Sequence, residues 1–584
     1  MEQQEKHNAY IIANGKLIKI YTIVLYLVSI LLYEIFCCNA EFTEAIIKGL
    51  EKTNYNFSPI RIVLYIAFLI LYIVFSKRFI NSAIEAMEVK AKRILIYVYH
   101  SIIVITICYI YIKLFNNITT QLLFSETVKV LCLLSGAIFI TYVSKNQIKN
   151  VIVASMTFGI VFCIMTEYYH ALDEKKHFMT AFNMANLHFN YVEDPIQTKD
   201  FEDVRQLMPY KEFYKLYSKK YEGTEIQSIN KEDNPSTPAT YFKILYITPS
   251  IGIFIAKTIG GSVADIYIIG RIFNIILYAL LVSIALKITP YKKNIFMVIA
   301  MLPMSMLLAA SYSIDGLCIG FVFIFIAYVF KLSTLEKINV KQWGTLALLF
   351  ILMLMAKSMA YLAVGALVLI LPLWKIIKNM NKKVKIGLAI STIIMLIIAI
   401  GAIFYIKKTM IVSDSRGAEG IDTAGQIEYI IQNPLNVALL EFNYMASSIF
   451  NFQWLHALHP HAFFSTDYAS AMFYIIMLLI IYTAIVDDDY NFKVKEKIVS
   501  ITTFLLVFFM TNIILYITFT PVGDSTIAGY QPRYLLPIIP LLMCSVSSKK
   551  LQNKSKNTSL MISITTGLIL TASLLCEVIS YKLI

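Results

Sequence analysis

Charged residues are scarce in this chain: they make up only 15% of its 584 residues, while hydrophobic residues make up 58%. A water-soluble protein contains about 25% charged residues. The shortage therefore excludes an ordinary water-soluble enzyme. Apolar runs of about 20 residues, the length that crosses a bilayer, recur along almost the whole sequence and leave no room for a large soluble domain.

Cysteine is also sparse, with eight residues that lie in or beside apolar segments. They lack the C-x-x-C spacing of a zinc site, so we interpret them as packing residues and exclude a disulfide framework. A signal-peptide cleavage pattern is missing as well, since no small-residue site ends the first apolar run, residues 17–37. We expect that run to remain as a membrane span.

Acidic residues are fewer than basic ones, 37 against 51, which gives a formal net charge of +14. The basic residues lie in short loops between apolar runs, where the positive-inside rule assigns them to the cytoplasm. The partner they indicate is the lipid bilayer, and nucleic acid is excluded. We expect a multi-pass protein of the plasma membrane, and the same rule predicts a cytoplasmic N-terminus.

The apolar runs predict an all-α integral membrane protein. Backbone groups in lipid must be hydrogen-bonded within each segment, and these runs are too long for barrel strands. Hydropathy gives roughly 13 to 15 transmembrane helices. The clearest runs are residues 17–37, 60–75, 94–114, 128–143, 151–169, 264–286, 295–310, 316–330, 386–405, 472–486, 501–519, 534–546 and 561–580.

Two apolar stretches need a separate interpretation. Residues 343–374 would form a helix of about 48 Å, too long for one untilted crossing. Both flanks are basic, so we predict two short crossings with Lys357 at the outer tip. Residues 241–259 contain Pro249 and are predicted to form a helix at the outer interface.

The chain divides into two parts. Residues 1–150 hold about four N-terminal helices, and residues 151–584 hold the main membrane domain. Long polar segments at 170–263 and 406–471 are predicted to be loops on the outer face.

Five ionisable residues beside the apolar runs map to this outer face: Asp173, Glu174, Asp315, Lys357 and Arg533. Charge near the membrane interior is costly, so each such residue suggests a function. We expect the five to converge on a single outer cavity although they come from different loops.

Each of these residues also has a purely structural interpretation. The adjacent carboxylates Asp173 and Glu174 suit proton abstraction or a divalent cation, but also a solvated start to the loop. Asp315 suits catalysis or the N-cap of the span that follows it. Lys357 and Arg533 suit phosphate binding, or interfacial snorkelling if each is taken alone.

A cluster of three histidines, His456, His459 and His461, has spacing that could bind a metal. Pro460 breaks the helical register and no carboxylate adjoins the cluster, which favours an interfacial loop. The sequence leaves metal dependence open, with a divalent cation as one option.

The region from about residue 151 onward resembles a bacterial family of polytopic membrane proteins known as domain of unknown function two-one-four-two. That family is in turn similar to the glycosyltransferase C superfamily. The resemblance rests on Asp173-Glu174 with His177-Phe178, Asn234-Pro235 to Tyr241, Arg271 with Asn274, Leu302-Pro303-Met304 with Ser311 to Asp315, Ala356-Lys357, and Gln531-Pro532-Arg533-Tyr534.

The resemblance implies a glycosyltransferase C-like core that transfers a sugar from a polyprenyl-phosphate carrier to an acceptor glycan or protein, in assembly of envelope polysaccharide or glycoconjugates. It implies Asp173 or Glu174 as the base and Asp315 as a second carboxylate. Contacts to the donor and its phosphate would come from Lys357, Arg533, Tyr534, His177 and Tyr241.

Two other functions stay open at this point. One is a transporter or flippase of lipid-linked glycans, which would favour substrate groups near the bilayer midplane and internal repeats. The other is a polymerase or ligase that joins lipid-linked oligosaccharides, resting more on arginine and histidine. The sequence does not identify the sugar or the acceptor.

Overall fold

The computed structural model describes most of the chain. The described residues are 2–49, 55–87, 89–116, 119–166, 168–169, 171, 173–189, 197–201, 215–223, 225–226, 242–357, 360–371, 385–387, 389–390, 393–394, 397, 421–451, 468–487, 490–546 and 557–583.

Eight helices among these residues are long and apolar enough to cross a membrane. They are Asn14–Cys38, Lys92–Tyr109, Thr120–Tyr142, Gln147–Met165, Val263–Ile288, Asp315–Ser333, Val494–Phe519 and Thr558–Ile579. Shorter apolar helices lie at Pro59–Val74, Val340–Ala356, Ala360–Ile370, Met472–Val486 and Pro532–Ser545. The chain is therefore an all-α integral membrane protein, as the hydropathy predicts.

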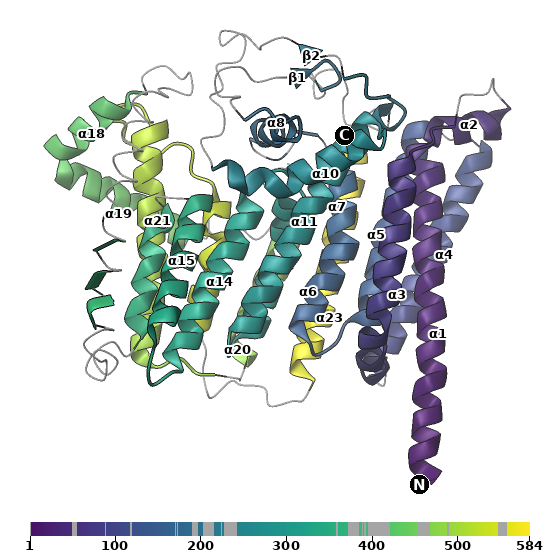
Figure 1. The fold of residues 1–584 in the computed structure, drawn as a ribbon, viewed down its shortest axis with the longest axis horizontal. Coiled ribbons are helices and arrows are strands. Elements are labelled where there is room, and N and C mark those ends of the chain that lie inside the picture. The colour runs from purple at the N-terminus through teal and green to yellow at the C-terminus, as the bar shows by residue number, and fades with distance from the viewer. Residues whose placement is uncertain are drawn as a thin grey trace.

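The N-terminal helices stand side by side at one edge of the bundle, drawn in purple to blue in Figure 1. They are α1 (Glu2–Leu32), η1 (Tyr33–Cys38), α2 (Ala40–Lys48), α3 (Pro59–Met87), α4 (Lys90–Asn116) and α5 (Thr120–Tyr142). Helix α5 begins where the Thr119 side chain accepts a hydrogen bond from the Leu122 N–H. Such a cap satisfies a donor that a helix start leaves open. Helix α5 also contacts α6 and α23, so it connects these helices to the rest of the bundle.

The central elements run from residue 147 to residue 370. They are α6 (Gln147–Ala154), η2 (Ser155–Gly159), α7 (Ile160–Met165), α8 (Glu174–Ala185), η4 (Lys243–Tyr246), α10 (Ile247–Thr258), α11 (Val263–Ile288), α12 (Lys293–Ala300), α13 (Pro303–Ala309), α14 (Asp315–Ser333), α15 (Val340–Ala356) and η5 (Ala360–Ile370). The 343–374 stretch indeed forms two short segments, because α15 ends immediately before Lys357 and η5 begins after it.

The C-terminal elements complete the bundle. They are α18 (Thr423–Gln432), α19 (Pro434–Phe450), α20 (Tyr468–Val486), α21 (Val494–Phe519), η8 (Pro532–Ile538), α22 (Ile539–Ser545) and α23 (Thr558–Leu583). The segment 406–471, expected as a loop, contains the helices α18 and α19. Pro434 occupies the first turn of α19, where its missing N–H removes no helical hydrogen bond.

One end of the bundle, at the top of Figure 1, carries α8, α10 and a short ladder of strands, and we name it the site end. Strands β1 (Gln197–Thr198) and β2 (Glu225–Ile226) pair antiparallel there. Just ahead of α14, the Tyr312 N–H donates to Glu174, the first residue of α8. Helix α14 therefore also begins at the site end.

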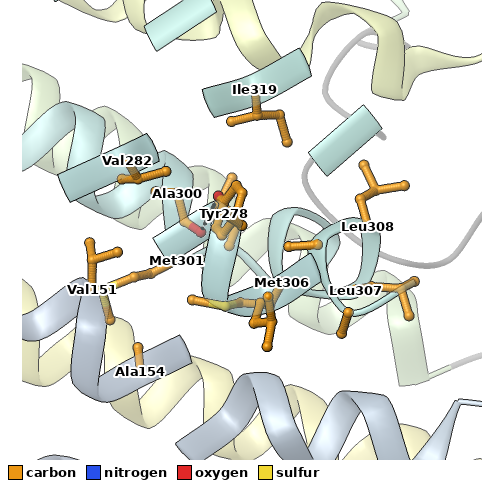
Figure 2. Packing of buried hydrophobic residues seen from close by; sticks show 14 of the residues in the cluster. Val151, Ala154, Tyr278, Val282, Ala300, Met301, Met306, Leu307, Leu308 and Ile319 are labelled. Atoms are coloured by element: carbon orange, nitrogen blue, oxygen red, sulfur yellow. Dashed lines mark hydrogen bonds between the residues drawn. The ribbon is translucent and has the colours of Figure 1, made fainter. Parts of the chain in front are cut away.

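The buried core fixes the broken helix pair α12–α13. Figure 2 shows Tyr278 of α11 among Val151, Ala300 and Ile319, which come from three other elements. The Tyr278 hydroxyl donates to the Ala300 carbonyl at 2.8 Å, at the point where α12 ends. Pro303 then starts α13, in whose first turn a proline is tolerated. This break brings the chain to the turn that precedes Asp315.

Candidate functional site

Three charged side chains from separate elements meet at the site end. The Lys357 Nζ lies 2.5 Å from one oxygen of Asp315, and the Arg533 Nε lies 3.2 Å from the other. Asp315 and Lys357 keep 14% and 19% of their side-chain surface exposed, so a ligand can reach the pair. The group carries a net charge of +1, because two cations share one carboxylate.

An aromatic ring lies against both cations. The Lys357 Nζ is 4.0 Å from the centre of the Tyr534 ring, and the Arg533 Cζ is 5.5 Å from it. Such contacts favour a cation through the negative face of the ring. The Tyr361 hydroxyl donates to the Tyr534 carbonyl at 2.6 Å, which ties η5 to η8. This bond fixes the backbone of Tyr534, whose ring packs against the Lys357 and Arg533 side chains.

The N-cap interpretation of Asp315 is wrong. Asp315 is the first helical residue of α14, while Ile314 occupies the cap position without a side-chain cap bond. The carboxylate pairs with Lys357 and Arg533 instead, because two cations nearby attract it more strongly than the helix N–H groups.

His177 faces the same charged group from α8. Its Nδ1 lies 2.7 Å from the Tyr246 hydroxyl in a buried contact. Burial lowers the pKa of His177 to about 4, and the carboxylates of Asp315 and Asp173 oppose this change. The cations of Arg533 and Lys357 lower the pKa of His177 further. The imidazole is therefore neutral at pH 7 and within electrostatic range of all four charged residues.

Asp173 sits at the edge of this group as an exposed residue immediately before α8. Its backbone is left-handed, with φ of 61°, a conformation that Asp tolerates better than most residues. The carboxylate makes no cap bond to α8, although Asp173 occupies the cap position. Its charge acts on both His177 and Arg533. This leaves a carboxylate beside the cationic group on the solvent side.

Glu174 has different surroundings from its neighbour. It is fully buried, and its two oxygens accept from the Arg271 Nε at 2.9 Å and the Arg271 Nη2 at 2.8 Å. The backbone N–H groups of Tyr312 and Ala171 also donate to this carboxylate. Four hydrogen bonds hold it away from solvent, and they connect α8, α11 and the turn before α14.

A comparison with models of protein families shows the family to which the chain belongs. A family model described as "Predicted membrane protein (DUF2142)" matches residues 156–542. The chain belongs to this family. No curated protein and no solved structure matches it. The matched range contains every charged residue of the site, whereas helices α1 to α5 lie outside it.

Arg271 is a residue of the DUF2142 region whose role the sequence reasoning missed. Beyond Glu174, its Nη1 donates to the carbonyls of Cys163 at 3.2 Å and Thr166 at 2.6 Å, where α7 ends. The signal was present, because a single arginine inside the apolar helix 263–288 requires a partner. Sequence spacing did not identify that partner, which lies 97 residues away.

A second polar residue of α11 acts on the turn before α14. Asn274 donates from its side chain to the Ser311 carbonyl at 2.8 Å, and the Tyr312 hydroxyl donates to the Tyr267 carbonyl at 2.8 Å. Together with Glu174, these bonds fix the turn that presents Asp315 to Lys357.

Some predicted site residues lie outside the described residues: Tyr241, His456, His459 and His461. Within the part of the chain that the structure describes, no group of three or more His, Cys, Asp or Glu side chains could hold a metal ion. A divalent cation at Asp173-Glu174 or at Asp315 stays a prediction for this DUF2142 protein.

Proposed function

We propose that this protein is a membrane glycosyltransferase that takes a sugar from a polyprenyl-phosphate carrier and transfers it to an acceptor glycan or protein. The observation that carries the proposal is the cluster of Asp315, Lys357 and Arg533 with Tyr534 at the end of a membrane helix bundle. The phosphate of a lipid-linked sugar lies at the membrane surface, where the bundle ends.

The net charge of the cluster suits the donor. A sugar joined to a lipid through one phosphate carries one negative charge, and the cluster carries +1. When the bond between the anomeric carbon and the phosphate oxygen breaks, the leaving phosphate gains a second negative charge. Lys357 and Arg533 stabilise this charge, and electrostatic stabilisation of this kind is a large contribution in many enzymes. Asp315 keeps the two basic groups together before the donor binds.

Asp173 is the base that the proposal favours. The acceptor hydroxyl gives its proton to the Asp173 carboxylate, its oxygen attacks the anomeric carbon from the face opposite the phosphate, and the configuration inverts. Glu174 does not suit this role, because four hydrogen bonds already occupy its carboxylate. We assign it a positioning role instead. His177 is neutral, so it adds a polar side chain to the site without adding charge.

Location completes the proposal. The protein acts in the plasma membrane with its N-terminus in the cytoplasm, so the site end faces outward, where envelope polysaccharides and glycoconjugates are assembled. This orientation rests on the lysine-rich loops at the opposite ends of the spans.

The test is sugar transfer by purified protein in nanodiscs, with synthetic polyprenyl-phosphate sugars as donors. Arg533→Ala and Lys357→Ala should lower kcat/KM by about a hundredfold or more, since each removes a charged contact that strengthens as the phosphate leaves. Lys220→Ala, an exposed lysine at the site end, is the matched control and should leave the rate unchanged. Transport of an intact lipid-linked glycan without any transfer would overturn the proposal in favour of a flippase.

A further inference from the structure

A large cavity lies between the N-terminal helices α1 to α5 and the region that the family model matches, residues 156–542, which we name the family domain. It has a volume of about 530 Å³ and is lined by residues of α1, α3, α5, the α6–α7 segment and α11. A single water molecule takes about 30 Å³ of liquid volume. The cavity therefore has room for a ligand of ordinary size, about 300 to 1,000 Å³.

The lining is mostly apolar, and its longer polar side chains bond to the protein. The Tyr26 hydroxyl donates to the Tyr65 carbonyl at 2.6 Å, and the hydroxyl of Tyr65 donates to Glu34 at 2.7 Å. The hydroxyls of Tyr72 and Tyr142 bond to each other at 2.7 Å. A polar ligand or a cluster of water molecules would find few partners here, since buried water needs two to four polar groups.

A buried ion pair closes one end of the cavity. Arg61 of α3 donates to Asp265 of α11 at 3.0 Å and to Glu34 of η1 at 2.9 Å. Arg61 and Asp265 both line the cavity, at the end where α11 begins. The other lining residues of α11 extend as far as Ser283, a rise of about 27 Å along the helix. That length is close to the hydrocarbon thickness of a bilayer, about 30 Å.

The cavity opens sideways toward lipid. Three apolar residues that line it are also strongly exposed: Leu71 by 49%, Ile276 by 40% and Leu280 by 56%. They lie on α3 and α11, whose apolar sequences place them within the membrane. The medium at this mouth is therefore hydrocarbon. An empty apolar space of this size would be costly, because its walls lose their packing partners.

We propose that the cavity holds an acyl chain of a bilayer phospholipid, which fills the junction between the N-terminal helices and the family domain. Volume, apolar lining, internally paired tyrosine hydroxyls and a mouth on the lipid-facing side all fit a hydrocarbon chain. The bound chain completes the packing between α3 and α11. This site is separate from the proposed transferase site and does not depend on that function.

The first test is native mass spectrometry of protein extracted in mild detergent. Wild type should retain phospholipid. Ala279→Phe fills the cavity from α11, and we expect it to lower the retained phospholipid by about tenfold, equivalent to losing 1.4 kcal/mol of binding. Ile284→Phe is the control, because Ile284 lies on the same helix at 36% exposure and does not line the cavity. Equal retention by all three proteins would overturn the proposal.

A second test, photo-cross-linking, uses only the wild-type protein and so does not depend on the folding of a variant. Wild-type protein is reconstituted in vesicles of phosphatidylethanolamine and phosphatidylglycerol that contain a phospholipid with a photoactivatable acyl chain. Cross-links are expected at cavity residues such as Leu131 and Ile268, which are 6% and 3% exposed. Cross-links confined to exposed residues, or recovery of polyprenyl lipid alone in the mass spectra, would contradict the proposal.

Discussion

Replacement of Glu174 by glutamine should destabilise the protein far more than the loss of one surface charge. Gln has nearly the same shape, so the change isolates the charge. It leaves the Arg271 guanidinium fully buried opposite a neutral amide. The side-chain NH₂ of the glutamine also faces an N–H donor of Arg271 or of the backbone, where the wild-type carboxylate only accepts.

The size of the effect follows from the burial of the pair. Removing one partner of a buried ion pair costs about 3 to 5 kcal/mol, because the remaining charge is left uncompensated. Glutamine keeps one acceptor oxygen, so it loses the hydrogen bond from either Tyr312 or Ala171, and this loss is part of the same change and is not added separately. A double variant, Glu174→Gln with Arg271→Met, removes the uncompensated charge and should recover a large part of the stability.

The assay is the thermal midpoint of folded, monodisperse protein in detergent, measured by size-exclusion chromatography after heating. Glu174→Gln should lower the midpoint clearly, while Glu222→Gln, an exposed residue at the site end, should not. Wild-type stability in Glu174→Gln, or a double variant no better than the single one, would refute the assignment of Glu174 as a buried positioning residue.

Three further predictions concern other contacts. Asp315→Asn leaves the two basic side chains to repel each other, so sugar transfer should fall by about tenfold or more in the kinetic assay, with the fold kept. The contribution of His177 to stability should fall as the pH drops below 6.5 toward 4, by about 1.4 kcal/mol per pH unit, because the unfolded state protonates His177 first. His177→Gln should remove this pH dependence from thermal midpoints. Arg61→Met leaves Asp265 and Glu34 without their cation and should cost about 3 to 5 kcal/mol, seen as early proteolysis between the N-terminal helices and the family domain.

The sequence was most informative about which residues lie at the same end of the bundle. The positive-inside rule predicts which end of each span meets the cytoplasm, and it needs no knowledge of packing. It therefore assigned Asp315, Lys357 and Arg533 to one end of the bundle, and these residues do lie in contact. The two short segments around Lys357 followed from the same charge pattern together with the length of the apolar stretch.

The sequence did not predict how the helices pack or which side chains they bury. Asp173 and Glu174 are adjacent, yet Asp173 has a left-handed backbone before α8 and Glu174 is the first helical residue, so one meets solvent while the other enters the core. The sequence did not say which face of α8 would dock, because that depends on Arg271 far along the chain. Similarly, the local sequence left Asp315 open between catalysis and an N-cap, because it contains no information about the geometry of two distant cations.

The measurement that tests the account most directly is transfer of a labelled sugar from a synthetic polyprenyl phosphate by wild type and Asp173→Asn in nanodiscs. The account predicts transfer with inversion by wild type, loss of at least about a hundredfold in the variant, and unchanged thermal stability. An inactive wild type across a panel of donors, or an Asp173→Asn protein as active as wild type, would contradict it.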